Sequence, residues 1–336
     1  MIAAVERKDA RVLTVHHHAE GGRTSGIAAG LTEDAIWIDL LDPTDEEKLS
    51  VEHKLEIRVP SEDLLSEIEA SSRLVYEDGR LHLSSPAVRI DEHGDAYLTP
   101  IGFIIGSKVL VTVRFAELAI FDAIAERIRT DESLQNGMCV FTALLEAIVD
   151  RGADVLEHLG TTTDALSRDV FKGGLIHSTK HARSTRRMRD ALKSIGAMAD
   201  RLSRARDVLL GAERIASFAG DVGSQWVTPA TRKRLDSISK DVTSLSDYET
   251  RLSDKIQLLL DAVLGFINIQ QNDLFRILTI VSIVGVLPAI LVGVWGMNFK
   301  GMPELAWAWG YPLAWLAIVA SVAVPLLWFR WAGWFD

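Results

Sequence analysis

Cysteine, signal-peptide features and enzyme motifs are scarce or missing in this chain of 336 residues. It has one cysteine, Cys139, so an intrachain disulfide is excluded and a reducing compartment such as the cytoplasm is favoured. The N-terminus is mixed and charged, without the apolar core of a signal peptide, and we expect it to stay in the compartment of synthesis. Because Walker sequences, dinucleotide fingerprints and nucleophile elbows do not occur, we expect neither an enzyme nor a prosthetic group.

Two C-terminal segments lack charge altogether. Residues 277–299 and 305–329, runs of 23 and 25 residues, contain no Asp, Glu, Lys or Arg. About 20 apolar residues allow a helix to cross a hydrocarbon core roughly 30 Å thick. We therefore expect two transmembrane helices. The alternative is a buried helix of a soluble core, which rarely avoids charge over such a length.

The charges that the chain does contain lie mostly before these segments and are mainly acidic. The first 273 residues hold 33 basic and 44 acidic side chains, and the last 63 hold three and two. An acidic surface does not suit nucleic acid, whereas it attracts cations. Arg276 and Arg330 flank the apolar hairpin and Lys300 lies in its connection, so the positive-inside rule favours two cytoplasmic termini by a small margin.

The patterning predicts an α+β membrane protein. β-rich runs occur at 11–15, 35–40, 80–90 and 97–113, with helical spacing at 45–55 and 61–71. Further helical patterns occur at 115–129, 137–171 and 177–218. The expected order is an N-terminal α/β cytoplasmic domain (1–115), a cytoplasmic helical region (116–228), a stalk helix (229–273), a first transmembrane helix (274–296), a connecting loop (297–304), a second transmembrane helix (305–330) and a cytoplasmic tail (331–336).

One very long helix is expected to include both the stalk and the first span. Thr228 and Pro229 are typical of a helix start, and no breaker follows until Pro288, so we predict a helix of about 67 residues, on the order of 100 Å long. Two heptad series run along it. The apolar series is Leu245, Leu252, Leu259 and Phe266, and the polar series, offset by two positions, is Asp247, Asp254, Asp261 and Asn268. The polar series faces either water or a central funnel shared between copies of the chain.

The connection between the spans contains Gly296, Met297 and Asn298, followed at 302–305 by Met-Pro-Glu-Leu. Together with WIDLLDP at 37–43 and WAWGYP at 307–312, this pattern resembles the CorA family of divalent-cation channels. The resemblance implies a homopentamer in the plasma (inner) membrane with both termini cytoplasmic. It also implies that the first span lines a pore, that the loop is external, and that the channel passes Mg²⁺, Co²⁺ and Ni²⁺ and closes as cytoplasmic Mg²⁺ rises.

The resemblance assigns roles to individual residues. Gly296, Met297 and Asn298 would form the selectivity filter, with Asn298 oxygens accepting hydrogen bonds from the hydrated ion. Glu304 would attract cations at the mouth. Helical steps back from Asn298 give an expected pore-lining face of Asn272, Phe275, Leu278, Ser282, Val286 and Ala289. The polar heptad series would line the cytoplasmic funnel.

Regulation is expected at a metal site between subunits, and the residues aligned with it are Asp91 and Asp236. Two features depart from the family pattern. Ala289 stands where the family often has a hydroxyl, and the lysine cluster after the second span is reduced to Arg330. Because of these two departures, we expect the pore around and below the filter to differ from that of the usual family member.

Two other functions remain open. A ZntB-like zinc transporter has the same architecture, but its loop usually lacks the acid that Glu304 provides here. A membrane-anchored scaffold without transport is the other alternative, and polar residues along an apolar helix argue against it. His16, His17 and His18 could bind zinc or nickel, although a solvated loop is the expected reading.

Overall fold

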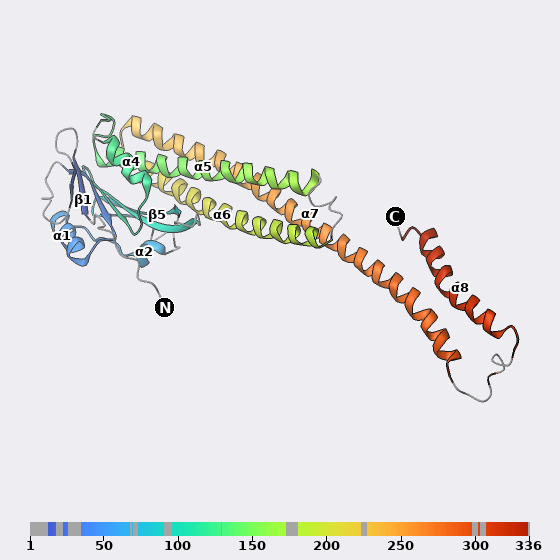
Figure 1. Cartoon of the computed structure of the whole chain (residues 1–336). Helices are drawn as coiled ribbons and strands as arrows, with labels where there is room; N and C mark the ends of the chain where they lie inside the picture. Colours follow the sequence, from blue (N-terminus) through green and yellow to red (C-terminus); the bar gives the residue numbers. More distant parts are fainter. Residues whose placement is uncertain are drawn as a thin grey trace. The chain divides into compact units, whose positions relative to one another are not determined.

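The computed structural model describes residues 13–17, 23–25, 35–67, 69, 73–90, 96–128, 130–172, 181–222, 227–297, 302 and 307–334. It divides into two compact units. Unit 1 comprises Met1–Lys172 and Ala191–Leu259, and unit 2 comprises Gly173–Asp190 and Leu260–Asp336. Each unit is described below by itself (Figure 1).

Unit 1 contains a seven-stranded sheet with the order β2-β1-β3-β7-β6-β5-β4. The strands are β1 (Leu13–His17), β2 (Arg23–Ser25), β3 (Ala35–Leu41), β4 (Leu74–Glu77), β5 (Arg80–Ile90), β6 (Ala96–Ile105) and β7 (Leu110–Arg114). β3 and β7 pair in parallel, and the other neighbouring strands pair antiparallel. The α/β character predicted for the N-terminal part is therefore confirmed.

Helices cover both faces of this sheet. On one face, Ile38 of β3 belongs to an apolar cluster with Val51 of α1 (Asp45–Leu55) and Leu65 of α2 (Glu62–Ser66). On the other face, the ring of Phe103 in β6 lies edge-on to that of Phe141 in α5 (Gly137–Lys172), with centroids 5.4 Å apart. Successive strand residues point to opposite faces, so a central strand such as β3 is buried throughout.

Local sequence signals account for several of these boundaries. Thr44 forms a capping box with Glu47, so α1 starts where predicted. The helix predicted at 61–71 is shorter, because Glu67 is extended with ψ 141° and α2 ends at Ser66. The single run predicted at 97–113 is two strands, since the chain turns where the Gly106 N–H donates to the Val109 carbonyl (3.0 Å). The short strands β2 and β4 were not predicted.

A buried polar network lies in the WIDLLDP segment. The Trp37 indole N–H donates to the Thr112 hydroxyl (2.9 Å), which in turn donates to Asp39 (2.7 Å). Arg114 forms a buried ion pair with Asp39 (2.8 Å), and its guanidinium lies 4.6 Å from the ring centre of Phe121. The network joins β3 and β7, the parallel pair, to α4 (Ala119–Arg127). We conclude that this segment has a structural role.

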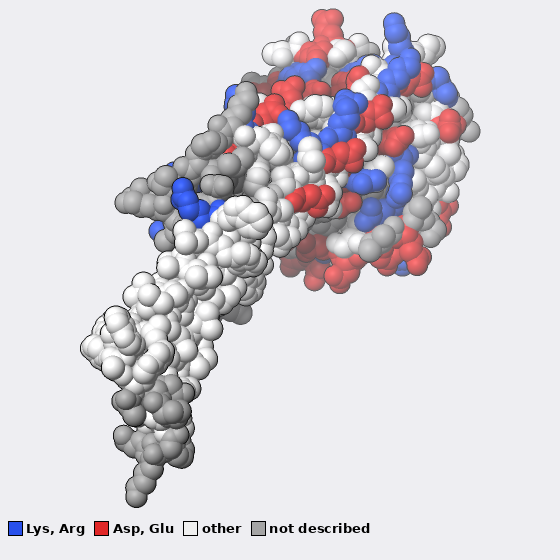
Figure 2. All heavy atoms as spheres, turned by 90° about the vertical axis from the view of Figure 1, so that its right-hand side faces the viewer, with Lys and Arg blue, Asp and Glu red and all other residues white. Residues whose placement is uncertain are grey.

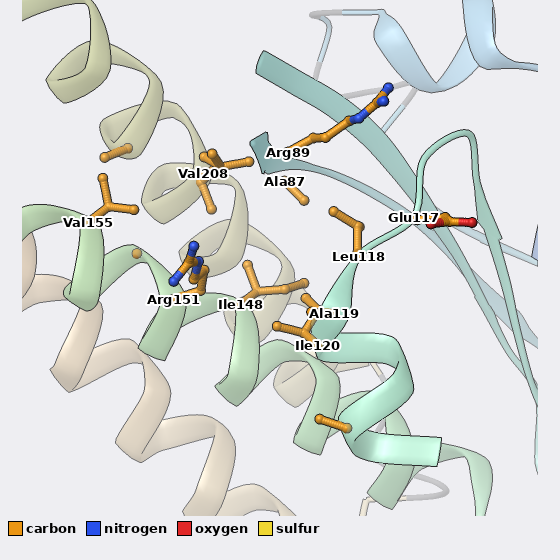
Figure 3. A pocket seen from close by; sticks show the side chains of 14 residues that line it. Ala87, Arg89, Glu117, Leu118, Ala119, Ile120, Ile148, Arg151, Val155 and Val208 are labelled. Atoms are coloured by element: carbon orange, nitrogen blue, oxygen red, sulfur yellow. The ribbon is translucent and has the colours of Figure 1, made fainter. Parts of the chain in front are cut away.

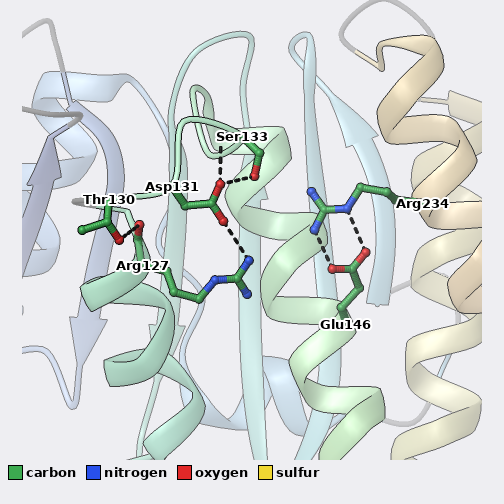
Figure 4. Close-up of polar contacts among 6 residues, drawn as sticks. All are labelled: Arg127, Thr130, Asp131, Ser133, Glu146 and Arg234. Carbon is green, nitrogen blue, oxygen red and sulfur yellow. Dashed lines mark hydrogen bonds and ion pairs between the residues drawn. The ribbon is translucent and has the colours of Figure 1, made fainter.

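The remaining helices of unit 1 are long and lie side by side (Figure 1). They are α5 and those parts of α6 (His181–Val222) and α7 (Pro229–Trp295) that belong to unit 1, up to Leu259. Arg234 of α7 donates two hydrogen bonds to Glu146 of α5 (2.8 and 2.5 Å), as Figure 4 shows. Gly160 of α5 allows close approach, since a Cβ there would clash with the Tyr248 hydroxyl of α7. α7 is continuous over 67 residues, which confirms the predicted long helix.

Unit 2 contains the C-terminal part of α7 and the helix α8 (Gly310–Trp331), and both are long and apolar enough to cross a membrane. At about 1.5 Å per residue, α8 matches a hydrocarbon core roughly 30 Å thick. It ends in a Schellman-type turn: Gly333 has φ +72°, and the Trp334 N–H donates to the Phe329 carbonyl (2.9 Å). Figure 2 shows charged side chains gathered over one part of the molecule, and the surface of the apolar helices is white.

Candidate functional site

The first part of α7 has one face that packs within unit 1. Its buried apolar residues are Leu235, Ile238, Val242, Leu252, Ile256 and Leu259, and the next buried residue of α7, Val263, belongs to unit 2. Two members of the predicted apolar heptad series, Leu252 and Leu259, are thus buried, while Leu245 and Phe266 are half-buried. The heptad spacing therefore predicted the packing face of this helix correctly.

The polar heptad series lies on the uncovered side of α7. Asp247, Asp254, Asp261 and Asn268 are all exposed in the single chain. This exposure is compatible with both alternatives, a polar series that faces water and a polar series that faces a central funnel. The funnel stays a prediction that depends on further copies of the chain.

The second part of α7 is apolar and uncovered. No residue from Leu264 to Trp295 is buried, and all of them belong to the described part of the chain. Large side chains such as Phe275, Leu278 and Val281 expose 60% or more of their surface. A contiguous apolar surface of this extent is not stable in water. The alternative of a buried helix in a soluble core is therefore wrong, and a membrane environment accounts for this segment.

The predicted pore-lining residues lie on this uncovered part of α7. Those residues are Asn272, Phe275, Leu278, Ser282, Val286 and Ala289, and all six are exposed. Their spacing of three or four residues keeps them near one face of a continuous helix. The structure thus provides an uncovered helix face at these positions, and its role in a pore remains a prediction.

Two residues near this face were missed by sequence reasoning. Gly293 follows Ala289 by four residues and precedes Gly296 by three, so helical spacing could have identified it. A Cβ added at Gly293 would meet nothing within 4 Å in the chain. Thr279 lies beside the face, and its hydroxyl donates to the Phe275 carbonyl (2.8 Å), which satisfies a polar group inside an apolar segment.

α7 ends directly before the predicted filter. The Gly296 N–H donates to the Val292 carbonyl (2.8 Å), and the Met297 N–H donates to the Val294 carbonyl (3.3 Å), which tightens the last turn. A Cβ at Gly296 would lie 3.0 Å from the Val292 carbonyl oxygen, so glycine suits this position. Met297 is exposed. Asn298 and the predicted cation-attracting Glu304 lie outside the described residues.

The predicted metal-binding residues are only partly described. Asp236 is exposed on α7, whereas Asp91 lies outside the described residues. His16 and His17 are in strand β1, not in a loop as expected, and His18 is outside the description. Among the residues that the structure describes, no three or more His, Cys, Asp or Glu side chains come together in a way that could hold a metal ion.

Charge interactions shift several pKa values in the helical part of unit 1. Burial, followed by the charges of Glu146, Asp154 and Asp241, raises the pKa of Asp150. Hydrogen bonds from Ser133 and Arg127 lower the pKa of Asp131 to about 2. Figure 4 shows these contacts beside the pair formed by Glu146 and Arg234, in which the hydrogen bond to Glu146 raises the pKa of the arginine. The two carboxyl groups thus differ because Asp131 accepts hydrogen bonds, whereas Asp150 is partly desolvated beside other acids.

Tryptophan is concentrated at the ends of the two apolar helices. Seven of the nine tryptophans lie in the last 42 residues, at positions 295, 307, 309, 315, 328, 331 and 334. Trp295 ends α7, Trp309 precedes α8, and Trp331 ends α8. Aromatic side chains are enriched where transmembrane helices meet the headgroup region, because they are amphipathic. The distribution supports a spanning role for both helices.

Several known proteins are similar to this chain in sequence or in structure. The model of the family described as "CorA-like Mg2+ transporter protein" matches residues 32–330. The magnesium transport protein CorA of Haemophilus influenzae is 32% identical over 302 residues, which cover 89% of this chain and 92% of the relative. The complete CorA magnesium transporter of Methanocaldococcus jannaschii has a TM-score of 0.74 at 19% identity and covers 99% of this chain and 100% of its own. The ZntB cytoplasmic domain of Vibrio parahaemolyticus has a TM-score of 0.56 at 11% identity, covering 76% and 98%.

Proposed function

This chain belongs to the CorA-like Mg²⁺ transporter family, and on that premise we propose that it is a magnesium channel of the plasma (inner) membrane. In this proposal it assembles as a homopentamer with both termini in the cytoplasm. The observation that carries the proposal is α7, which is packed in a helical bundle at one end and is an uncovered apolar span at the other. A helix of this kind can connect a cytoplasmic domain to an ion pathway without a break.

Five copies of α7 would surround the pore in the proposed assembly. Asn272 and Ser282 would offer polar groups to the ion, and apolar side chains such as Leu278 and Val286 would form constrictions between them. Apolar constrictions can close a pore by dewetting. The exposure of these side chains in the single chain supports the arrangement, because such a face requires either lipid or a water-filled interior.

The proposed filter lies where α7 ends. Mg²⁺ gives up its water reluctantly, so a filter that accepts the hydrated ion needs hydrogen-bond acceptors in a ring. Asn298 side chains would provide these acceptors, with Gly296 and Met297 holding the turn. Glu304 would raise the cation concentration at the outer mouth. A filter of this type would also admit Co²⁺ and Ni²⁺.

Cytoplasmic magnesium would regulate the channel in the same proposal. Asp247, Asp254, Asp261 and Asn268 would attract cations into the funnel, because they form one exposed polar series on α7. Asp91 of one subunit and Asp236 of another would bind Mg²⁺ between them and hold the closed state. Occupancy of this site would fall as cytoplasmic Mg²⁺ falls, which releases the subunits.

The filter assignment is tested by Mg²⁺ uptake into liposomes that contain the purified full-length protein and a magnesium-sensitive dye. Asn298→Ala is expected to lose uptake by about tenfold or more, since a barrier increase of about 1.4 kcal/mol is sufficient for that loss. Leu316→Ala, on the exposed surface of α8, is the matched control and is expected to retain uptake.

Equal uptake by wild type and Asn298→Ala would contradict the filter assignment. The same liposomes, assayed with Zn²⁺, Co²⁺ and Ni²⁺, distinguish the competing functions. Zinc uptake without magnesium uptake would indicate a ZntB-like transporter, and no flux of any ion would indicate a non-transporting scaffold.

A further inference from the structure

A cavity of about 530 Å³ lies in unit 1, away from α7 (Figure 3). It is formed by the end of β5, the start of α4, the middle of α5 and part of α6. Small-molecule sites in proteins usually have volumes of about 300–1,000 Å³. The cavity is therefore large enough for a ligand, and none of the roles proposed for the ion pathway involves it.

The walls of the cavity are apolar and firmly packed. Leu118, Ile148 and Val208 contribute aliphatic side chains that are buried, as are Ala87 and Ala205 beside them. Alanine at these positions leaves space that a larger side chain would fill. The elements around the cavity are well packed, so the cavity is present without a ligand, as in a pre-formed binding site.

Close backbone approaches on either side keep α6 in place. A Cβ at Gly152 of α5 would lie 3.2 Å from a methyl carbon of Leu209 in α6. A Cβ at Gly211 of α6 would lie 2.8 Å from the Ser85 hydroxyl of β5. Because α6 is held against α5 and β5 at these two points, the space between them cannot close by a small shift of the helix.

The charge at the cavity is positive. Figure 3 shows the Arg151 side chain among the apolar side chains of the wall, whereas Arg89 and Glu117 extend away from them. Arg151 lies 3.8 Å from the carboxylate of Asp154, and both side chains are well exposed. An ion pair of that geometry is weak, so the guanidinium retains donors for another anion.

We propose that this cavity binds a small aliphatic carboxylate, with its carboxylate on Arg151 and its hydrocarbon body against the half-buried side chains of Ile120 and Val155. Arginine donates two parallel hydrogen bonds to a carboxylate, which suits a single anionic head. None of the described residues that line the cavity is aromatic, so an aliphatic body fits better than a planar base. The site is independent of ion conduction and does not rest on the proposed channel function.

Binding is tested by isothermal titration of the full-length protein in lipid nanodiscs with hexanoate, and with hexanamide as the uncharged analogue. Wild type is expected to bind hexanoate with measurable heat. Arg151→Gln is expected to bind it about tenfold to a hundredfold more weakly, because a hydrogen bond to a charged group contributes about 1.5–3 kcal/mol. Arg168→Gln, on an exposed position of the same helix, is the matched control and should retain affinity.

A second variant keeps the test decisive if Arg151→Gln does not fold. Ala123 lines the cavity but is exposed, so Ala123→Leu is expected to fill the space and abolish binding without disturbing the core. Three results would overturn the proposal: no heat with hexanoate, equal affinity for hexanamide, or wild-type affinity in both cavity variants. Equal binding of glycerol 3-phosphate would also overturn it, because that anion lacks the aliphatic body.

Discussion

At the scale of single residues, Asp39 and Arg114 form a buried ion pair in the described part of unit 1. Both side chains are almost fully buried, and Arg114 also donates to the Ala116 carbonyl (3.0 Å). Removal of one partner from such a pair leaves an uncompensated charge in the interior. The pair therefore stabilises one particular packing of β3, β7 and α4.

Asp39→Ala is expected to lower the free energy of unfolding of unit 1 by about 3–5 kcal/mol, because Arg114 then remains buried without its carboxylate. Thermal unfolding of the full-length protein, followed by circular dichroism, measures the loss. Asp169→Ala, at an exposed position of α5, serves as the control and should change little. A loss no greater than that of the control would mean that Arg114 finds another partner.

Asp150 gives a pH-dependent prediction. Its pKa is raised in the folded protein, so the folded state favours the protonated carboxyl and the ionised form lowers stability above that pKa. Asp150→Asn should therefore unfold at a higher temperature than wild type at pH 7. Its gain in the free energy of unfolding should be less than about 1 kcal/mol, because water screens exposed charges. As the pH falls through the raised pKa toward the ordinary value, wild type becomes protonated and the difference should disappear. Thermal unfolding from pH 7 to pH 4 measures this, and a difference that is independent of pH would contradict it.

At the scale of elements, α7 combines two environments in one helix. Up to Val263 it has a buried face, and from Leu264 it has none. The heptad series and the absence of charge were both readable from the sequence, because a helical period of about 3.6 fixes which residues share a face. The proposed pore could be predicted only in part from the sequence, since a pore between copies of the chain would require contacts that no single chain contains.

The errors at this scale have physical causes. β6 and β7 were predicted as one strand because the turn from Gly106 to Val109 carries a single glycine as its signal. β2 and β4 were missed because they have three and four residues and thus little room for alternation. Helix starts with a clear side-chain cap, such as Thr44, were predicted at the right residue.

Gly293 tests the pore face of α7 directly. Valine fits there without a clash inside the chain, and it is a better helix former than glycine, so Gly293→Val should fold and insert. If the face lines the pore, one added valine side chain from each copy of the chain would narrow it. Mg²⁺ uptake into liposomes should then fall by about tenfold or more, since a barrier increase of about 1.4 kcal/mol is sufficient for that loss. Val284→Ile, nine residues and thus about two and a half turns from Gly293, lies on the opposite side of α7 and is the control. Unchanged uptake in Gly293→Val would show that this residue does not line the pore.

At the scale of the whole molecule, the two units require opposite surroundings, water for unit 1 and lipid for unit 2. Unit 1 has a sheet covered on both faces and carries most of the charge, so it is stable in water. Unit 2 has helices whose apolar surfaces are left uncovered in the single chain, and lipid can cover such surfaces. Membership of a transporter family agrees with the apolar helices of unit 2, because transport needs a membrane-embedded path.

The order of the units along the chain bears on how the protein acquires its orientation during synthesis. Unit 1 is made of residues up to Leu259, so it emerges from the ribosome before either apolar helix. Domains fold as units and N-terminal ones fold first, and a folded domain resists being threaded across a bilayer. The side on which unit 1 folds would then determine the topology, and the near balance among Arg276, Lys300 and Arg330 would matter little. Evolution would thus be free to change those few charges without inverting the protein.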